Sequence, residues 1–276
     1  MKKKISGLLV LFFMLMIAVW VTMDGSINKV KSCFHRDGFI MLSSDDGVNY
    51  LFDTGADITV LYTDTVPESF FFLTSSEVTD VLGNNYLGKK YFSFSSKIGL
   101  VEVDRLIALL ISKRAGMKHV DGIIGADLID RSDWWIDFRS GIISNDIPLV
   151  EKKPDMVIHC QKRKGLYYAD LNINGIRFSD LLIDTGYDRA DFLLKKKEME
   201  FLSDYSFVRN DSCFGFTNVG DIISIYGIKD CKVDAVSFKD VTLVESFSRR
   251  LVGLPFLKRF SYIVFDTRNR KIDCFF

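Results

Sequence analysis

Two stretches of the chain, residues 53–55 and 184–186, both read Asp-Thr-Gly, and each directly follows an apolar run. Two carboxyl groups brought within a few ångströms cannot both ionise cheaply, so one pKa falls, the other rises, and the pair holds a single proton. The ionised member can then act as a general base on a water molecule while the protonated member donates a hydrogen bond to a carbonyl oxygen. We therefore predict that Asp53 and Asp184 form a catalytic dyad.

The residues before both triplets predict β-hairpins. An Asp46-Gly47 turn joins residues 39–42 to residues 48–52, and an Asn174-Gly175 turn joins residues 166–173 to residues 176–183. Asp-Gly and Asn-Gly are favoured in two-residue hairpin turns because both positions need positive φ. In each copy the second strand brings the aspartate to its end.

Further landmarks repeat in the same order. A hydrophobic-hydrophobic-Gly triplet occurs at 123–125 and at 251–253, and a strand ending in aspartate follows at 134–137 and at 262–266. The offsets between the copies are 131 residues for the Asp-Thr-Gly aspartates, 128 for the glycines and 129 for the later aspartates. We interpret this as a duplication. It predicts domains at 28–149 and 150–276, with the polar, proline-containing stretch 145–154 as linker and short helices at 126–130 and 255–260.

The N-terminus predicts export. Three lysines, Lys2 to Lys4, precede a mainly apolar run from Ile5 to Met23. This run is close to the roughly 20 residues that span a bilayer, and bulky side chains stand where a signal-peptide cleavage site would need small ones. Residues 1–27 are therefore a signal anchor or a cleaved signal peptide, and we favour the anchor. The lysines would stay in the cytoplasm, with the rest of the chain outside as a membrane-anchored, secreted or periplasmic domain.

Composition limits the partners. The 276 residues include 36 basic and 36 acidic side chains, so the formal charge is zero and no basic excess indicates nucleic acid binding. The five cysteines and three histidines show no metal-ligand spacing, so we predict no metal or other cofactor. Cys213 and Cys231 are the nearest candidates for a disulfide, although most of the cysteines are as well explained as small buried residues.

These motifs together resemble the aspartic peptidases of the pepsin and retropepsin type, over residues 36–276. Asp53 to Asp57 with Ile123 to Gly125 is closest to the retropepsin form, and two copies in one chain resemble a fused retropepsin dimer. The resemblance implies an all-β, bilobal acid-protease fold, a monomer with an internal pseudo-dimer, and a peptide or protein substrate bound as an added strand. It also implies a covering flap at residues 82–88, with a second-copy hairpin near residues 214–223.

The resemblance also assigns roles to neighbours of the dyad. Thr54 and Thr185 would join the two loops through hydroxyl-to-backbone hydrogen bonds, and the amides of Gly55 and Gly186 would orient the carboxylates. Tyr86 would be a flap aromatic, although it is equally well explained as an ordinary strand residue.

Three positions qualify this reading. Asp57 and Asp188 are interpreted as structural ion-pairing residues, yet Ala126 and Leu254 stand where the family has the partner arginine. Tyr187 stands where the family has Ala, Ser or Thr, so its phenol would contact substrate, fill part of the cleft or disturb the second carboxylate. Besides an endopeptidase, the sequence therefore permits a catalytically inactive, membrane-tethered peptide-binding module, or a structural β-domain.

Overall fold

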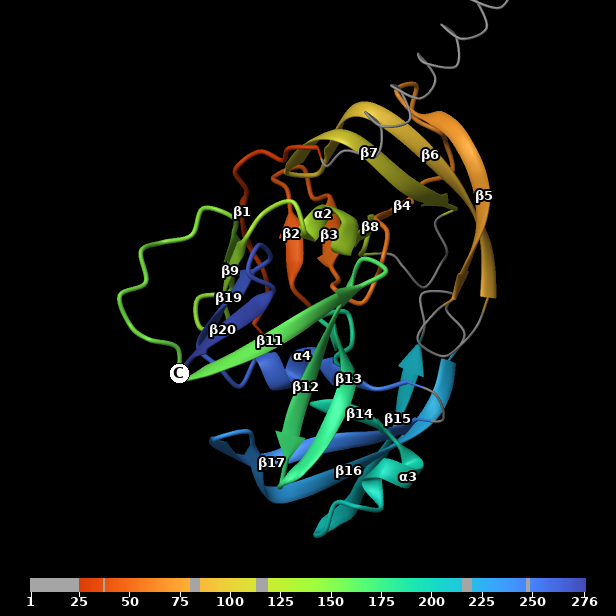
Figure 1. The fold of residues 1–276 in the computed structure, drawn as a ribbon. Coiled ribbons are helices and arrows are strands. Elements are labelled where there is room, and N and C mark those ends of the chain that lie inside the picture. The colour runs from red at the N-terminus through yellow and green to blue at the C-terminus, as the bar shows by residue number, and fades with distance from the viewer. Residues whose placement is uncertain (1–24, 37, 80–84, 113–118, 215–219, 247–248) are drawn as a thin grey trace, which may run out of the picture.

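A computed structural model describes residues 25–36, 38–79, 85–112, 119–214, 220–246 and 249–276. The side chains of Thr79, Tyr86, Cys213 and Phe214 also lie outside this description. The described chain is mostly β-strand with three four-residue helices, which confirms the all-β class (Figure 1).

The first sheet is built from the N-terminal half of the chain. It has seven strands in the order β2-β3-β8-β4-β7-β6-β5, so β5 forms an edge. Their bounds are β2 Met41–Ser43, β3 Asn49–Phe52, β4 Val60–Tyr62, β5 Phe71–Thr79, β6 Asn85–Ile98, β7 Val101–Ile111 and β8 Gly122–Ile124.

The second sheet has thirteen strands and joins the two halves. Its order is β1-β10-β9-β19-β20-β11-β12-β13-β18-β14-β17-β16-β15, and β9 pairs antiparallel with β19. Three strands of the first copy therefore belong to the same sheet as the second copy. Their bounds are β1 Lys31–Cys33, β9 Trp134–Asp137, β10 Ile142–Ser144, β11 Met156–Arg163, β12 Leu166–Ile173, β13 Ile176–Asp184, β14 Phe192–Lys195, β15 Tyr205–Phe214, β16 Gly220–Val233, β17 Val236–Ser246, β18 Leu251–Gly253, β19 Tyr262–Asp266 and β20 Lys271–Phe275.

The predicted hairpins before the two aspartates are present. β2 pairs with β3 and β12 pairs with β13, and Gly47 and Asn174 have φ of +81° and +51° in the two turns. The predicted short helices are α2, Ala126–Ile129, and α4, Leu254–Leu257, each capped by the glycine of the repeated triplet. A third helix, α3 (Lys196–Met199), has no predicted counterpart.

The two halves repeat one another in register. Leu51 pairs with Ile123 in a parallel ladder, and Leu182 pairs with Leu251 in the equivalent ladder of the second copy. The sequence duplication is thus a structural duplication around the Asp-Thr-Gly turns. One large apolar core, which includes Phe52, Trp134 and Phe256, extends through both halves.

The hairpin that carries the predicted flap is longer than residues 82–88, since its ladder begins at Phe71, paired with Phe92. One sequence-based expectation needs correction. Cys213 pairs with Asp221, ten residues along β16 from Cys231, which puts the two cysteines about 30 Å apart at strand geometry. Cys231 is a buried free thiol, so it forms no disulfide with Cys213.

Candidate active site

The two Asp-Thr-Gly turns lie against one another at the centre of the molecule. Asp53 follows directly after β3, and Asp184 is the last residue of β13. In each copy, the residue after the Asp-Thr-Gly turn is bonded to the residue after the repeated glycine triplet. Ala126 N–H donates to Ala56 O and Leu254 N–H donates to Tyr187 O, both at 2.8 Å. Residues 131 positions apart in sequence thereby share one site.

Thr54 and Thr185 connect the turns by reciprocal hydrogen bonds. Thr54 Oγ1 donates to the carbonyl of Ile183 at 2.7 Å and accepts from Thr185 N at 3.1 Å. In the mirror arrangement, Thr185 Oγ1 donates to the carbonyl of Phe52 at 2.7 Å and accepts from Thr54 N at 3.0 Å. Both threonines are buried, so the amide N–H and the hydroxyl group of each find their hydrogen-bond partners in the opposite turn.

The two glycines bring the carboxyl groups together. Gly55 N–H donates to Asp53 Oδ1 at 2.8 Å, and Gly186 N–H donates to Asp184 Oδ1 at 2.9 Å. A Cβ added at Gly55 would lie 2.4 Å from Asp184 Cγ, and one added at Gly186 would lie 2.5 Å from Asp53 Cγ. Each carboxyl group therefore packs against the glycine of the opposite turn, in space that no side chain can enter.

Burial dominates the electrostatics of this pair. It raises the pKa of Asp184 well above its usual range, and the negative charge of Asp53 and a hydrogen bond between the two carboxyl groups raise it further. Burial also raises the pKa of Asp53, against the opposing effect of hydrogen bonds from Gly55 and from the Asp184 carboxyl group. The expectation that one pKa falls is therefore wrong, because desolvation penalises both charges. The pair therefore holds a proton to higher pH than an exposed aspartate would.

Tyr187 is buried beside the second turn. Its side chain is 4% exposed and packs in an apolar cluster with Leu182, Leu193 and Leu251. The matching residue of the first copy, Ala56, packs against the matching cluster around Val60. The phenol is thus part of the packing beside the second turn.

The other predicted residues have mixed outcomes. The backbone of Tyr86 pairs with Val78, but its side chain and residues 82–84 of the flap predicted at 82–88 lie outside the described residues. Asp188 forms an ion pair with Arg189 at 3.1 Å, as expected of a structural residue. Asp57 is exposed and has no ion pair among the described residues.

Sequence analysis missed a pair of arginine clamps. Arg131 donates to the carbonyls of Asp104 and Arg105, and Arg259 donates to those of Lys239 and Asp240, all at 2.7–3.0 Å. Both arginines lie six residues after the glycine of their triplet, so the repeat offset of 128 could have revealed them. They hold β7 and β17 against the helix that follows each triplet.

Two further residues beside the first turn were also missed. Tyr62 is buried, and its phenol pKa is raised by burial and by the charge of Asp53, which places it within electrostatic reach of the dyad. Asp127 accepts a hydrogen bond from Thr59 Oγ1 at 2.7 Å, and Thr59 Oγ1 in turn accepts from Gly125 N at 3.2 Å. Burial raises the pKa of Asp127 from 3.8 to about 6.

We expect Asp127→Asn to stabilise the protein at neutral pH. A carboxyl group whose pKa is raised on folding binds its proton more tightly when folded, so stability falls as pH rises from about 4 through about 6. The shift corresponds to at most about 3 kcal/mol at pH 7, and an amide avoids this cost while keeping the acceptor oxygen. Thermal unfolding at pH 4 and pH 7 measures the effect: the variant should match the parent at pH 4 and exceed it at pH 7. An equal or lower stability at pH 7 would contradict the assignment.

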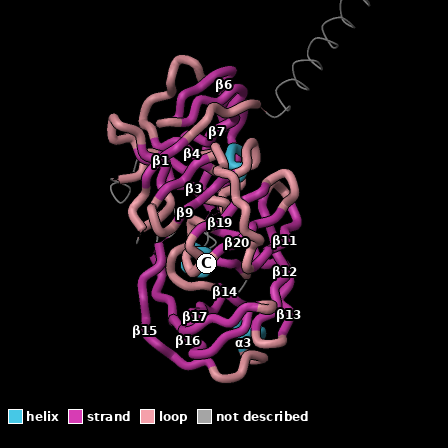
Figure 2. Tube along the Cα trace, turned by 90° about the vertical axis from the view of Figure 1, so that its left-hand side faces the viewer, coloured by secondary structure: helices cyan, strands magenta, loops and turns pink. Residues whose placement is uncertain are grey.

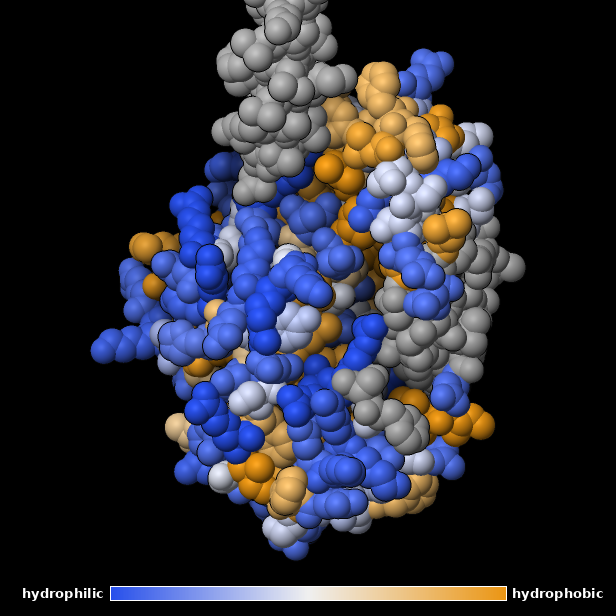
Figure 3. All heavy atoms as spheres, turned by 45° about the vertical axis from the view of Figure 1, so that its right-hand side comes forward, coloured by the Kyte–Doolittle hydropathy of each residue, from blue (hydrophilic) through white to orange (hydrophobic). Residues whose placement is uncertain are grey.

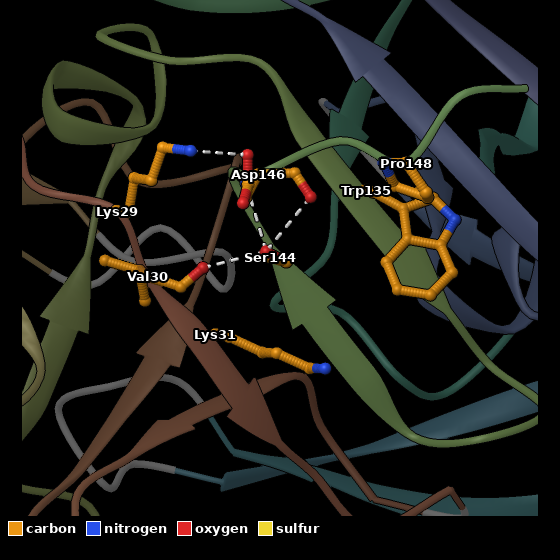
Figure 4. Close-up of a pocket in the computed structure, with 7 residues that line it drawn as sticks. All are labelled: Lys29, Val30, Lys31, Trp135, Ser144, Asp146 and Pro148. Carbon is orange, nitrogen blue, oxygen red and sulfur yellow. Dashed lines mark hydrogen bonds and ion pairs between the residues drawn. The ribbon is translucent and has the colours of Figure 1, made fainter.

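A hollow beside β1 offers fewer groups that could take part in catalysis. It is lined by Lys29, Val30, Lys31, Trp135, Ser144, Asp146 and Pro148 (Figure 4). Lys29 and Asp146 form an exposed ion pair at 2.9 Å, and the Ser144 hydroxyl donates to the carbonyl of Val30. These groups satisfy one another, and the lining includes one carboxylate only, so this hollow cannot supply a paired acid and base.

Among the described residues, no group of three or more His, Cys, Asp or Glu side chains is arranged to hold a metal ion. Within the same residues no helix is both long and apolar enough to cross a bilayer, and the predicted anchor at residues 5–23 lies outside them. Comparison with known protein families finds no match for this chain, and comparison with curated proteins finds no relative. Function is therefore inferred from the geometry of the site.

Proposed function

We propose that this protein is an aspartic endopeptidase with the bilobal fold of the pepsin and retropepsin type, in which Asp53 and Asp184 activate one water molecule. The observation that carries the proposal is the reciprocal bonding of Thr54 and Thr185, which holds a half-buried and a buried carboxyl group against one another. A structural role alone would not require two ionisable groups packed together, because burying them costs stability.

The reaction would proceed without a covalent enzyme intermediate. Ionised Asp53 would take a proton from the water as it attacks the peptide carbonyl carbon, and protonated Asp184 would hydrogen-bond the carbonyl oxygen. The tetrahedral intermediate would collapse as Asp53 passes the proton it took from water to the leaving nitrogen, the C–N bond breaks, and Asp184 regains any proton it gave to the carbonyl oxygen. The packing of each carboxyl group against the glycine of the opposite turn supports a proton shared by the pair, in which the two roles are complementary.

We place the substrate between the two hairpins that extend from the sheets. β5–β6 and β15–β16 are long antiparallel ladders in equivalent parts of the two halves. An extended peptide lying between them could add main-chain hydrogen bonds, and closure of such hairpins would exclude water from the dyad. The N-terminal segment would hold the enzyme on the outer surface of a membrane, acting as a monomer without metal or nucleic acid.

The alternative is an inactive, membrane-tethered peptide-binding module, which Tyr187 suggested. The burial of Tyr187 in an apolar cluster favours the enzyme instead, because a side chain packed in the interior is not presented to a bound peptide.

Digestion of a peptide library by the full-length protein, from about pH 3 to about pH 8, tests the proposal, because a shared-proton dyad is competent within such a range. We expect cleavage that EDTA leaves unchanged. Peptides retained without cleavage at every pH, by protein shown to be folded, would instead support the binding module.

A further inference from the structure

The edge of the first sheet is unusually apolar at its surface. Phe71, Phe72, Leu73 and Phe94 are 55%, 57%, 45% and 52% exposed, and we call these four residues the apolar edge. Figure 3 shows hydrophobic side chains gathered in the upper part of this face. Single exposed apolar residues are ordinary, but a contiguous group of large ones indicates an interaction surface.

The apolar edge is ordered by contacts among its own rings. Phe71 and Phe94 meet edge to face at 5.9 Å between ring centroids, and Phe94 meets the buried Phe92 at 4.8 Å. Phe72 packs on Tyr91 at 5.7 Å. Because β5 is the edge strand, its consecutive apolar residues point to both faces of the sheet at its edge. Such an edge is suited to shallow insertion into a lipid interface.

The beginning of the described chain lies close to this edge. Asp104 N–H donates to the carbonyl of Ser26 at 3.1 Å, and the Ser26 hydroxyl donates to the Asp104 carboxylate at 2.8 Å. On the other side of β7, Asp104 pairs with Ser95, the neighbour of Phe94. Two strand spacings of about 4.8 Å therefore put Phe94 about 10 Å from Ser26.

The apolar N-terminal run ends at Met23, only three residues before Ser26. Three residues reach at most about 10 Å, so the apolar edge lies within about 30 Å of the end of that run. A bilayer that held the run would have its surface beside the apolar edge.

We propose that the apolar edge inserts into the interfacial region of the bilayer that holds the N-terminal segment. Aromatic side chains favour that region, and burying three exposed phenylalanine rings there removes apolar surface from water. The inference rests on the proposed anchor and is independent of the proposed catalysis.

The charges nearby bear on the kind of membrane contact. Exposed charges of both signs lie beside the apolar edge, since Lys97 on β6 is paired with Glu102 on β7 and Asp104 follows. Charges of both signs give no net attraction to anionic headgroups, so the contact should form on zwitterionic lipid and should resist salt.

The contact would orient the whole molecule. β6 and β7 lie at one end of the structure and β16 and β17 lie towards the other, in both views (Figures 1 and 2). The seven-stranded sheet would therefore face the membrane, and the end of the molecule with β16 and β17 would lie farther from it. Phe207 on β15, 58% exposed, supplies a matched control residue.

Photo-crosslinking of the full-length protein in phosphatidylcholine vesicles tests the inference. Phe71→p-benzoylphenylalanine, Phe94→p-benzoylphenylalanine and the control Phe207→p-benzoylphenylalanine would be irradiated, and lipid adducts quantified by mass spectrometry. We expect at least about fivefold more lipid adduct at positions 71 and 94 than at 207, unchanged by 0.5 M salt, because interfacial insertion is apolar.

Equal adduct yields at the three positions, or adducts at 71 and 94 with a second protein copy in place of lipid, would overturn the inference. Extraction at alkaline pH separates its two assumptions. If the protein stays with the vesicles but gives no adduct, the anchor is supported and the contact of the apolar edge with lipid is refuted. If the protein is released from the vesicles, both are refuted.

Discussion

Asp53→Asn and Asp184→Asn are each expected to abolish peptide hydrolysis, with a loss of at least about 10³-fold in kcat, since each removes one half of a general acid and base pair. Without Asp53 no base remains to take the proton of water, and without Asp184 no acid remains to polarise the carbonyl. Because the two carboxyl groups act as a unit, the double variant should be little worse than either single one. Retained hydrolysis in either single variant would refute the dyad.

The same substitutions should leave the fold intact at neutral pH. The pKa of both carboxyl groups is raised on folding, so their ionisation destabilises the native state as pH rises above about 4. An amide in place of Asp184 removes that cost while keeping an acceptor for Gly186 N–H. Thermal unfolding at pH 7 should therefore give a midpoint no lower than that of the parent. Asp127→Asn, which changes a carboxyl group outside the dyad, is the matched control and should remain active.

Thr54→Val is expected to have the second largest effect, a loss of about 3 to 6 kcal/mol in the free energy of unfolding, because it leaves two buried backbone groups without partners. These are the carbonyl of Ile183, which loses its 2.7 Å donor, and the amide of Thr185, which loses its 3.1 Å acceptor. Valine keeps the shape of threonine, so the loss reports hydrogen bonding and not packing. Against a total stability of about 5 to 15 kcal/mol, such a loss is severe.

Thr54→Ser is the matched control, since it keeps the hydroxyl and should cost much less. Chemical denaturation of both variants, together with Thr185→Val and the double valine variant, forms a double-mutant cycle. The two valine substitutions break shared bonds, so their combined cost should be clearly less than additive. A Thr54→Val stability within about 0.5 kcal/mol of the parent would show that the threonines do not hold the turns together.

The features that sequence revealed were those with a local chemical signature. The Asp-Gly and Asn-Gly turns predicted the hairpins before each aspartate, and the repeated triplets ending in Gly125 and Gly253 predicted the strands beside them. The bonding of Thr54 to Thr185 followed from the resemblance to the peptidase family. The structure shows that bonding directly, whereas membership of the family stays a proposal.

The features that sequence missed depend on long-range packing. The run from Phe70 to Leu73 does not alternate between apolar and polar residues, so nothing marked it as the start of a strand. The raised pKa of Asp53 comes from the whole surrounding core, which no local pattern reports. The packing of Tyr187 depends on Leu193 and Leu251, which come from two other strands of the sheet.

The pH dependence of kcat/KM, measured on the best peptide from the library digestion, tests the central claim most directly. A pair that shares one proton predicts a bell-shaped profile, with an acid limb where the pair gains a second proton and an alkaline limb where it loses its last one. Since burial raises both pKa values, both limbs should lie above the pH at which an exposed aspartate titrates, and Asp184→Asn should show no activity at any pH. A profile without an alkaline limb, or a bell that survives in Asp184→Asn, would contradict the account.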